Sequence, residues 1–277
     1  MRQDAGTSVV GRLRASAAAV WLLGICGLAA CPGPSSNGQG TMTPRPGAMG
    51  SGQQSGSEPS EPGEPGDEVQ QGPASGQNIP GQFDYYVLSL SWSPQFCATR
   101  GKQARPDDPQ CGVGASFGFV LHGLWPQYSG RGYPESCSVG VTPDAALVQR
   151  MLRIMPSPRL VQHEWQKHGT CSGLTPERYF AQAESLFSGL HIPARLQNPS
   201  EPVATSVSEL RQELVQHNPG LLPDSIALYC RGPMLREVRL CYSKDFKPQS
   251  CSATVRDGCP RAGITVLPVR NNPGSSN

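Results

Sequence analysis

The cysteines constrain the fold of this 277-residue chain more than any other feature. Of its 10 cysteines, Cys26 and Cys31 lie in an apolar N-terminal stretch, and the rest lie between residues 97 and 259. An even number of cysteines in an exported domain predicts disulfide bonds, and full pairing would leave no thiol as a nucleophile. No C-x-x-C occurs, which argues against a zinc ribbon and thioredoxin chemistry. Spacing alone does not choose among the many possible pairings.

The N-terminus predicts export. Arg2, Arg12 and Arg14 precede an apolar stretch of about 16 residues, shorter than the roughly 20 residues of a membrane-spanning helix. It ends in Leu-Ala-Ala-Cys, which looks like a bacterial lipobox with Cys31 as the lipidated residue. We therefore expect a lipoprotein signal peptide over residues 1–30 and a mature chain anchored by acyl chains in the periplasm or at the cell surface. The alternative is an ordinary secretory signal, which would release an extracellular protein.

Composition changes sharply near residue 81. Residues 31–81 are mainly Gly, Pro, Ser, Gln and Glu, so they cannot bury enough apolar surface to fold. We expect a disordered tether there and one folded domain over residues 82–277. From residue 82 onward, 19 Lys and Arg stand against 15 Asp and Glu, a balance too weak for tight binding of duplex DNA. It suits transient contact with a phosphate-bearing substrate.

The folded region has the pattern of strands, then helices, then strands. Alternating β-formers predict strands over residues 83–92 and 117–125, and the second is apolar on both faces, which favours a central position. Capping signals predict helices over residues 143–155, with Thr142 as the cap before Pro143, and over residues 176–190, and a fourth helix from Ser206 or Ser208 to about residue 217. A helix over residues 159–168 is expected to stop at Gly169. Strands follow over residues 225–230, 235–242 and 263–269, and residues 98–114 are predicted to be a loop. This order predicts an α+β domain with an antiparallel-rich central sheet packed with helices.

Reactive side chains are concentrated in residues 163–171. On a helix, Glu164 and His168 share one face, and His163 and Lys167 share the neighbouring face. The two histidines are five residues apart and point about 140° apart, which does not match the H-E-x-x-H metal motif, so we expect no metal site. The alternative is a solvated helix face with incidental ion pairs. Cys171 follows closely and is well placed to fix the end of this helix.

A further histidine, His122, interrupts the apolar run of the second predicted strand. The alternative is a core histidine with its hydrogen bonds satisfied, and Trp125 could likewise be ordinary core. The two stretches together hold three of the chain's 5 histidines, which favours an acid/base site that acts on an anion. His191 and His217 lie outside both stretches, and we predict that they are surface or core residues.

Residues 119–126 and 163–171 resemble the two signature blocks of the ribonuclease T2 family. Residues 237–248 also resemble a late strand and loop of that family, especially in its bacterial members. The resemblance covers residues 83 to about 260. It implies an α+β fold, secretion, and metal-free endonucleolytic cleavage of single-stranded RNA with broad base tolerance and no cofactor.

The resemblance also implies roles for individual residues. His168 matches the family's general base and His122 its general acid. Glu164 and Lys167 match the pair that positions and stabilises the pentacovalent phosphate, and His163 matches a phosphate-binding histidine. Histidine suits both proton transfers because its ordinary pKa lies near neutrality.

Aromatic residues are the implied base-binding groups. Trp125 looks like the ring on which a base stacks, and Tyr133 is a candidate for a second platform. Some family members have Asp or Glu after the Trp-Pro pair. This chain has Gln127 there, so no purine preference follows from that position.

The resemblance further implies four disulfides. These are Cys97–Cys111, Cys137–Cys171, Cys230–Cys259 and Cys241–Cys251. We expect a monomer that acts on RNA and spares DNA, because DNA lacks the 2′-OH nucleophile. Two rivals stay open: a divalent-metal nuclease or phosphodiesterase, and a non-catalytic RNA-binding surface lipoprotein on the same fold.

Overall fold

The computed structural model describes residues 78–101 and 105–269. The structure does not describe the predicted signal peptide, the predicted lipidation site Cys31 or most of the predicted tether. In the part of the chain that is described, no helix combines the length and apolar character needed to cross a membrane.

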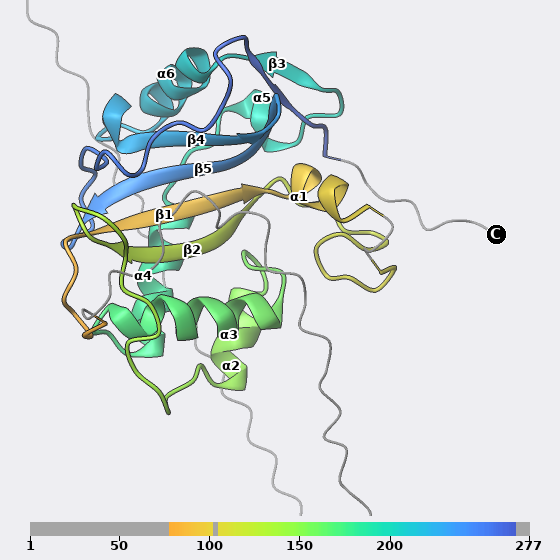
Figure 1. The fold of residues 1–277 in the computed structure, drawn as a ribbon. Helices are drawn as coiled ribbons and strands as arrows, with labels where there is room; N and C mark the ends of the chain where they lie inside the picture. The colour runs from red at the N-terminus through yellow and green to blue at the C-terminus, as the bar shows by residue number, and fades with distance from the viewer. Residues whose placement is uncertain (1–77, 102–104, 270–277) are drawn as a thin grey trace, which may run out of the picture. The chain divides into compact units, whose positions relative to one another are not determined.

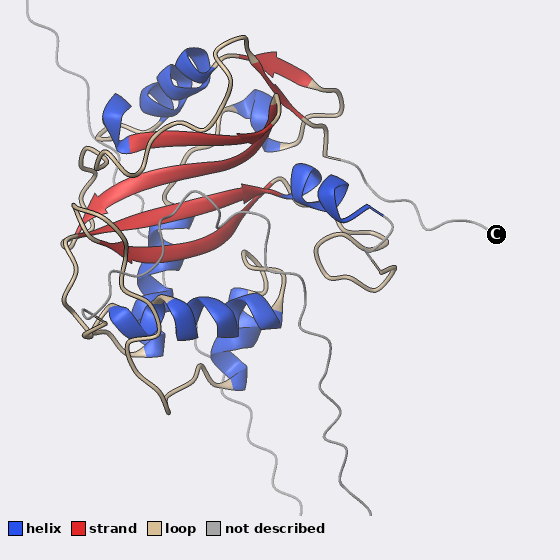
Figure 2. Ribbon diagram, in the orientation of Figure 1, coloured by secondary structure: helices blue, strands red, loops and turns tan. Residues whose placement is uncertain are grey.

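A single mixed sheet forms the centre of the described domain (Figures 1 and 2). Its strands are β1 (Tyr85–Trp92), β2 (Phe119–Gln127), β3 (Val203–Thr205), β4 (Ile226–Arg231), β5 (Met234–Ser243) and β6 (Ile264–Val266). The order is β2-β1-β5-β6-β3, and β4 also pairs with β5. Among these strands only β5 and β6 pair in parallel. The predicted α+β class with an antiparallel-rich sheet is therefore confirmed.

The helices are α1 (Ser93–Arg100), α2 (Ala145–Met151), α3 (Pro158–Lys167), α4 (Pro176–Ser188), α5 (Ala194–Gln197) and α6 (Val207–His217), with short 3-10 turns η3 (Gly169–Cys171) and η4 (Pro223–Ser225). Two helices, α4 and α6, begin at predicted caps, whereas the cap of α2 is Asp144 and not the predicted Thr142. The side chains of Asp144, Ser157, Thr175 and Ser206 each accept a hydrogen bond from a first-turn N–H of α2, α3, α4 and α6, respectively. These bonds satisfy donors that a helix start leaves unpaired.

Several local predictions need correction, and the short helix α5 was not predicted. The helix predicted to reach residue 155 ends at Met151. The loop predicted from residue 98 begins later, because α1 extends to Arg100, and β3 was not predicted. Both α1 and β3 are short and carry little apolar periodicity, so their position depends on tertiary contacts.

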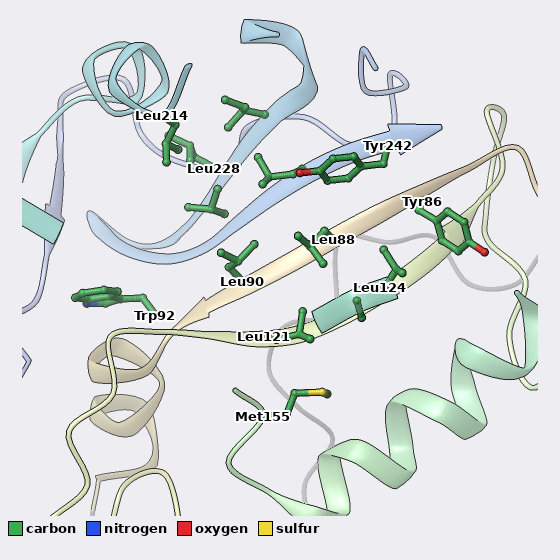
Figure 3. Packing of buried hydrophobic residues seen from close by; sticks show 14 of the residues in the cluster. Tyr86, Leu88, Leu90, Trp92, Leu121, Leu124, Met155, Leu214, Leu228 and Tyr242 are labelled. Carbon is green, nitrogen blue, oxygen red and sulfur yellow. The ribbon is translucent and has the colours of Figure 1, made fainter. Parts of the chain in front are cut away.

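One face of the sheet carries the main hydrophobic core (Figure 3). Alternate residues of β1 point into it, and Leu121 and Leu124 join them from β2. The helices α2, α3, α4 and α6 cover this face with apolar side chains, including Met151, Trp165, Phe180 and Leu214. This packing fixes α3 relative to the sheet.

The other face holds a smaller apolar cluster. Its members are Tyr85, Val87, Trp125, Ala227, Tyr229, Cys241 and Val255, with Cys251 packed against them. The C-terminal loop therefore lies over this face. Two disulfides, Cys230–Cys259 and Cys241–Cys251, tie the loop to β4 and β5. The other two disulfides are Cys97–Cys111 and Cys137–Cys171. All four pairs are those that the resemblance implies.

The prediction that the second strand is central was wrong. β2 lies at the end of the sheet order and pairs with β1 alone among the described strands. Its outer side is covered instead by the segment after α2, where the Leu121 N–H donates to the carbonyl of Ile154 at 2.8 Å. The strand is apolar on both faces because helices cover one and the Trp125 cluster covers the other.

Candidate active site

A β-bulge sets the direction of His122. The β1–β2 pairing matches Ser89 with Gly123 and then Leu90 with Leu121, so His122 is the extra residue of the bulge. Regular alternation from Leu124 would place residue 122 on the core face. The bulge gives that face to Leu121 and turns His122 away from it. The titratable ring thereby leaves the apolar core that its sequence neighbours predict.

Two carboxylates flank the His122 ring. Its Nε2 lies 3.7 Å from Oε1 of Glu164, and its Nδ1 lies 3.5 Å from Oε1 of Glu237. Its side chain is 12% exposed, whereas both glutamate side chains are 2% exposed. His122 is therefore the most accessible member of this group.

The helix α3 supplies the second half of the site. It lies beside β2 in Figure 1 and contacts it. Glu164 and His168 are buried at 1% and 4% exposure, whereas His163 is exposed and Lys167 is half-buried. The two faces predicted from helical spacing are thus distinct, one buried in the site and one open to solvent. His168 follows the last helical residue, and its N–H donates to the Glu164 carbonyl at 3.0 Å.

Trp125 connects the two halves. Its Nε1–H donates to Oε2 of Glu164 at 2.7 Å. Its ring centroid lies 5.1 Å from that of His122 and 5.4 Å from that of His168. A single indole therefore contacts both imidazoles and orients the carboxylate beside them.

Gly123 leaves the space that this arrangement needs. A Cβ at this position would lie 2.7 Å from the Cδ atom of Glu164 and would also overlap the indole nitrogen of Trp125. Only a residue without a side chain fits between the strand and the carboxylate. Gly123 is part of the first signature block, but only the position of Glu164 in the structure explains why a glycine is needed there.

Burial and charge act together on His168. Burial lowers the pKa of His168 well below its usual value, and the positive charges of Lys167, His163, His122 and Arg239 lower it further. The neutral imidazole is thus the favoured form at neutral pH. Its Nδ1 is buried and has no hydrogen-bond partner among the described residues, so Nε2 is the nitrogen that a substrate can meet.

Tyr133 packs against the same histidine. Its ring centroid lies 5.8 Å from that of His168, and Lys167 Nζ lies 5.8 Å from its centre. The Cys137–Cys171 disulfide and a hydrogen bond from Ser136 N–H to the Lys167 carbonyl hold this loop against the end of α3. The loop therefore helps to enclose the site.

Neither predicted base platform offers an open ring face in this structure. Trp125 is 3% exposed and Tyr133 is 5% exposed. Stacking of a base on either ring would require movement of a neighbouring side chain. Gln127 is also buried, and its Nε2 has no hydrogen-bond partner among the described residues.

Sequence reasoning assigned no role to a buried charged pair on β5. Arg239 donates to Oε2 of Glu237 through Nε at 2.9 Å and approaches the same oxygen with Nη2 at 2.7 Å. Burial raises the pKa of Glu237, but the charge of Arg239, the nearby His122 ring and the charge of Arg236 outweigh it and hold the pKa below its usual range. The signal was present as Arg236, Glu237 and Arg239 within a strand that is otherwise mostly apolar.

The remaining histidines lie elsewhere. His191 and His217 are exposed, and Nδ1 of His217 interacts with the Glu213 carbonyl on α6. Within residues 78–101 and 105–269, no group of three His, Cys, Asp or Glu side chains is arranged to hold a metal ion.

Comparison with known proteins relates this chain to one family. The profile of the ribonuclease T2 family matches residues 83–251. A ribonuclease of Aeromonas hydrophila is 39% identical over 174 residues, which covers 60% of this chain and 74% of that protein. A probable ribonuclease of Haemophilus influenzae is 34% identical over 189 residues, and the match covers 64% of each chain.

Solved structures agree at the level of the fold. Trichomaglin, described as a novel S-like ribonuclease, superposes with a TM-score of 0.55 at 24% identity and covers 68% of this chain and 100% of its own. A mutant of RNase MC1 in complex with 5′-UMP superposes with a TM-score of 0.52 at 23% identity, covering 66% and 97%. The family profile and the Aeromonas relative together show that this chain belongs to the ribonuclease T2 family.

Proposed function

We propose that the protein is an exported endoribonuclease that cleaves single-stranded RNA without a metal ion and with low base specificity. The reaction is transphosphorylation to a 2′,3′-cyclic phosphate and a 5′-OH end, followed by hydrolysis of the cyclic phosphate. The observation that carries the proposal is the pair of imidazoles, His122 and His168, in contact with one indole beside the buried Glu164.

The chemistry requires a base, an acid and a cation. RNA carries its own nucleophile, because the 2′-OH lies beside the phosphate. In the proposed mechanism, His168 removes the 2′-OH proton, the oxygen attacks phosphorus, and the bond to the 5′-oxygen breaks as His122 donates a proton to it. The two histidines exchange roles when water opens the cyclic phosphate.

The environments of the two histidines support this assignment. His168 is buried beside Lys167 and the other cations, which favours the neutral form that a base needs. His122 has a carboxylate near each ring nitrogen, and nearby negative charge favours the protonated form that an acid needs. Different surroundings thus suit the same side chain to opposite tasks.

Phosphate binding is assigned to the open face of α3. His163 is exposed and Lys167 is half-buried, so both can meet a phosphate that approaches from solvent. Glu164, held by Trp125, is assigned to positioning the pentacovalent phosphate next to them. Low base specificity fits position 127, which is Gln and not an acidic residue. Trp125 and Tyr133 remain the proposed stacking groups, and a base would stack on them once neighbouring side chains have moved.

The same proposal covers export. The Leu-Ala-Ala-Cys sequence supports cleavage before Cys31, its lipidation, and a tether over residues 31–81 that separates a monomeric catalytic domain from the membrane. Labelling with a radioactive fatty acid tests the anchor, and Cys31→Ser should abolish the label and release the protein.

The decisive experiment incubates the purified protein with single-stranded RNA in excess EDTA and identifies the new ends. We expect full activity, cyclic-phosphate ends, and no cleavage of DNA of the same sequence. His122→Phe and His168→Phe should lower cleavage at least about a hundredfold, the usual contribution of one acid/base group. The matched control His217→Phe changes an exposed histidine on α6 and should retain activity.

The outcomes separate the rivals. Activity that disappears in EDTA and returns with a divalent cation would support a metal nuclease. RNA binding without cleavage would support a non-catalytic binding protein. Near-normal turnover by either folded Phe variant would refute the two-histidine mechanism.

A further inference from the structure

The pair formed by Glu237 and Arg239 lies on β5, opposite the helix that carries most of the site. The glutamate is 1% exposed and the arginine 2% exposed. Removal of two charges from water is costly, and their attraction offsets that cost only with good geometry. Replacement of a buried ion pair by apolar residues is often neutral or stabilising, so Glu237 and Arg239 are candidates for a role other than stability.

The contacts of Glu237 divide between its two oxygens. Oε2 receives Arg239 at 2.9 and 2.7 Å and Ser89 Oγ at 3.5 Å. Oε1 receives Arg236 Nη2 at 3.1 Å and lies 3.5 Å from Nδ1 of His122. One oxygen is thus held by β5 and β1 while the other faces the imidazole.

Arg239 also supports the aromatic side of the site. Its guanidinium carbon lies 4.8 Å from the ring centre of Trp125 and 4.0 Å from that of Tyr229. The guanidinium therefore connects the carboxylate at His122 with the indole that orients Glu164. A single pair on β5 reaches both halves of the site.

We infer that Glu237 is a positioning residue for His122: it accepts the Nδ1–H, keeps the ring oriented with Nε2 toward the leaving 5′-oxygen, and stabilises the imidazolium. Arg239 holds this carboxylate in place and supports Trp125. The inference rests on the proposed function of His122 as the general acid. A carboxylate at the non-reacting nitrogen is a common way to fix the tautomer and orientation of a histidine.

Other charged groups also face His122 and must be included in any account of its titration. Glu164 on α3 lies 3.7 Å from Nε2 and favours the protonated ring. His168, just after α3, interacts electrostatically with His122, and the cations Arg239 and Arg236 lie beyond Glu237 on β5. The carboxylate beside Nδ1 is thus that of Glu237, and the carboxylate beside Nε2 is that of Glu164.

The test is the pH dependence of kcat/KM for Glu237→Gln, which keeps the shape of the side chain and removes its charge. A nearby opposite charge shifts a pKa by about one unit or more, so the alkaline limb, where the acid loses its proton, should move down by about one pH unit. We expect kcat at neutral pH to fall about tenfold or more while KM changes little. Glu237→Asp retains the charge, so its alkaline limb should lie close to that of the wild-type protein.

The matched control is Glu213→Gln. Glu213 is also a carboxylate bound by an arginine, Arg195, but it lies on α6 outside the site. Its substitution should leave both limbs of the profile unchanged. An alkaline limb that stays in place in folded Glu237→Gln, or moves equally in the control, would overturn the inference.

A second measurement does not depend on RNA cleavage. Proton NMR titration of the His122 ring, assigned with His122→Phe, should show a lower pKa in Glu237→Gln than in the wild-type protein. If the wild type cleaves no RNA but the titration shifts, the proposed function fails and the positioning contact stands. If the wild type is active and the titration is unchanged, the positioning role fails alone. If Glu237→Gln does not fold, both measurements are made on Glu237→Asp. The alkaline limb and the pKa of His122 should then shift in the same direction by a smaller amount. No shift in either would contradict the inference.

Discussion

Substitution of Gly123 by alanine tests how closely the site is packed. The added Cβ would lie 2.7 Å from Cδ of Glu164, which is closer than Cβ atoms in folded proteins approach another non-bonded heavy atom. The backbone of Gly123 is outside the left-handed region, so alanine is compatible with its φ. Any cost therefore comes from the clash with the carboxylate and the indole and not from the backbone.

The size of the effect follows from what must move. Relief of the clash displaces the Glu164 carboxylate from Trp125 and weakens a buried, charge-assisted hydrogen bond of 2.7 Å. Such a bond contributes about 1.5–3 kcal/mol, and overpacking of a dense site costs about 1–3 kcal/mol. We expect a loss of about 3 kcal/mol, which for a domain of this size lowers Tm by roughly 6–12 °C. A shift of about 1 Å in Glu164 should also lower kcat/KM about a hundredfold.

The assay combines thermal unfolding followed by circular dichroism with initial rates on a dinucleotide substrate. Gly130→Ala is the matched control, because a Cβ there meets nothing within 4 Å and the glycine has no positive φ. It should retain both Tm and rate. Glu164→Ala removes the group that clashes, so Gly123→Ala should cost clearly less stability in that background than in the wild type.

Two results would refute this reasoning. One is a Gly123→Ala variant whose Tm and kcat/KM both match those of Gly130→Ala. The other is an equal loss of stability from Gly123→Ala with and without Glu164, because the clash with the carboxylate would then not be the cause.

Two further predictions concern the disulfides and the base. Reduction of the four disulfides should unfold the domain, because each contributes about 2–4 kcal/mol and their sum is comparable with the usual stability of about 5–15 kcal/mol of a folded domain. An unchanged Tm and retained RNA cleavage in excess dithiothreitol would contradict this. Burial and then the charge of Lys167 lower the pKa of His168, so Lys167→Gln should raise that pKa, keep the base protonated to higher pH, and move the acid limb of kcat/KM upward. The control Lys247→Gln changes an exposed lysine and should leave the limb in place, and an acid limb that stays fixed in Lys167→Gln would show that this charge does not act on His168.

Much of the local structure was predictable because its signals are local. The predicted caps at Thr175 and Ser206 mark helix starts through hydrogen bonds within one turn. The two faces of α3 follow from the helical period alone. Short elements such as β3 have no such signal, since contacts with distant strands hold them.

The position of β2 shows the limit of pattern reasoning. An apolar strand that is covered on both faces has the same sequence pattern at the centre of a sheet as at an edge. Here helices and the Trp125 cluster provide the cover, and the Ile154 carbonyl satisfies an N–H on the open side. Which neighbour supplies the cover depends on the whole fold.

The α+β class, several helix starts and the two faces of α3 follow from local patterns in the amino-acid sequence, because periodicity and capping act over a few residues. The roles of the two signature blocks come from their resemblance to the ribonuclease T2 family. The folded domain was needed to show that His122 lies in a bulge, that Gly123 must make room for Glu164, and that Glu237 faces the imidazole. These features arise where β1, β2, β5 and α3 meet. Strand register, bulges and the pairing of buried charges are set by partners far apart in the chain, so no local pattern specifies them.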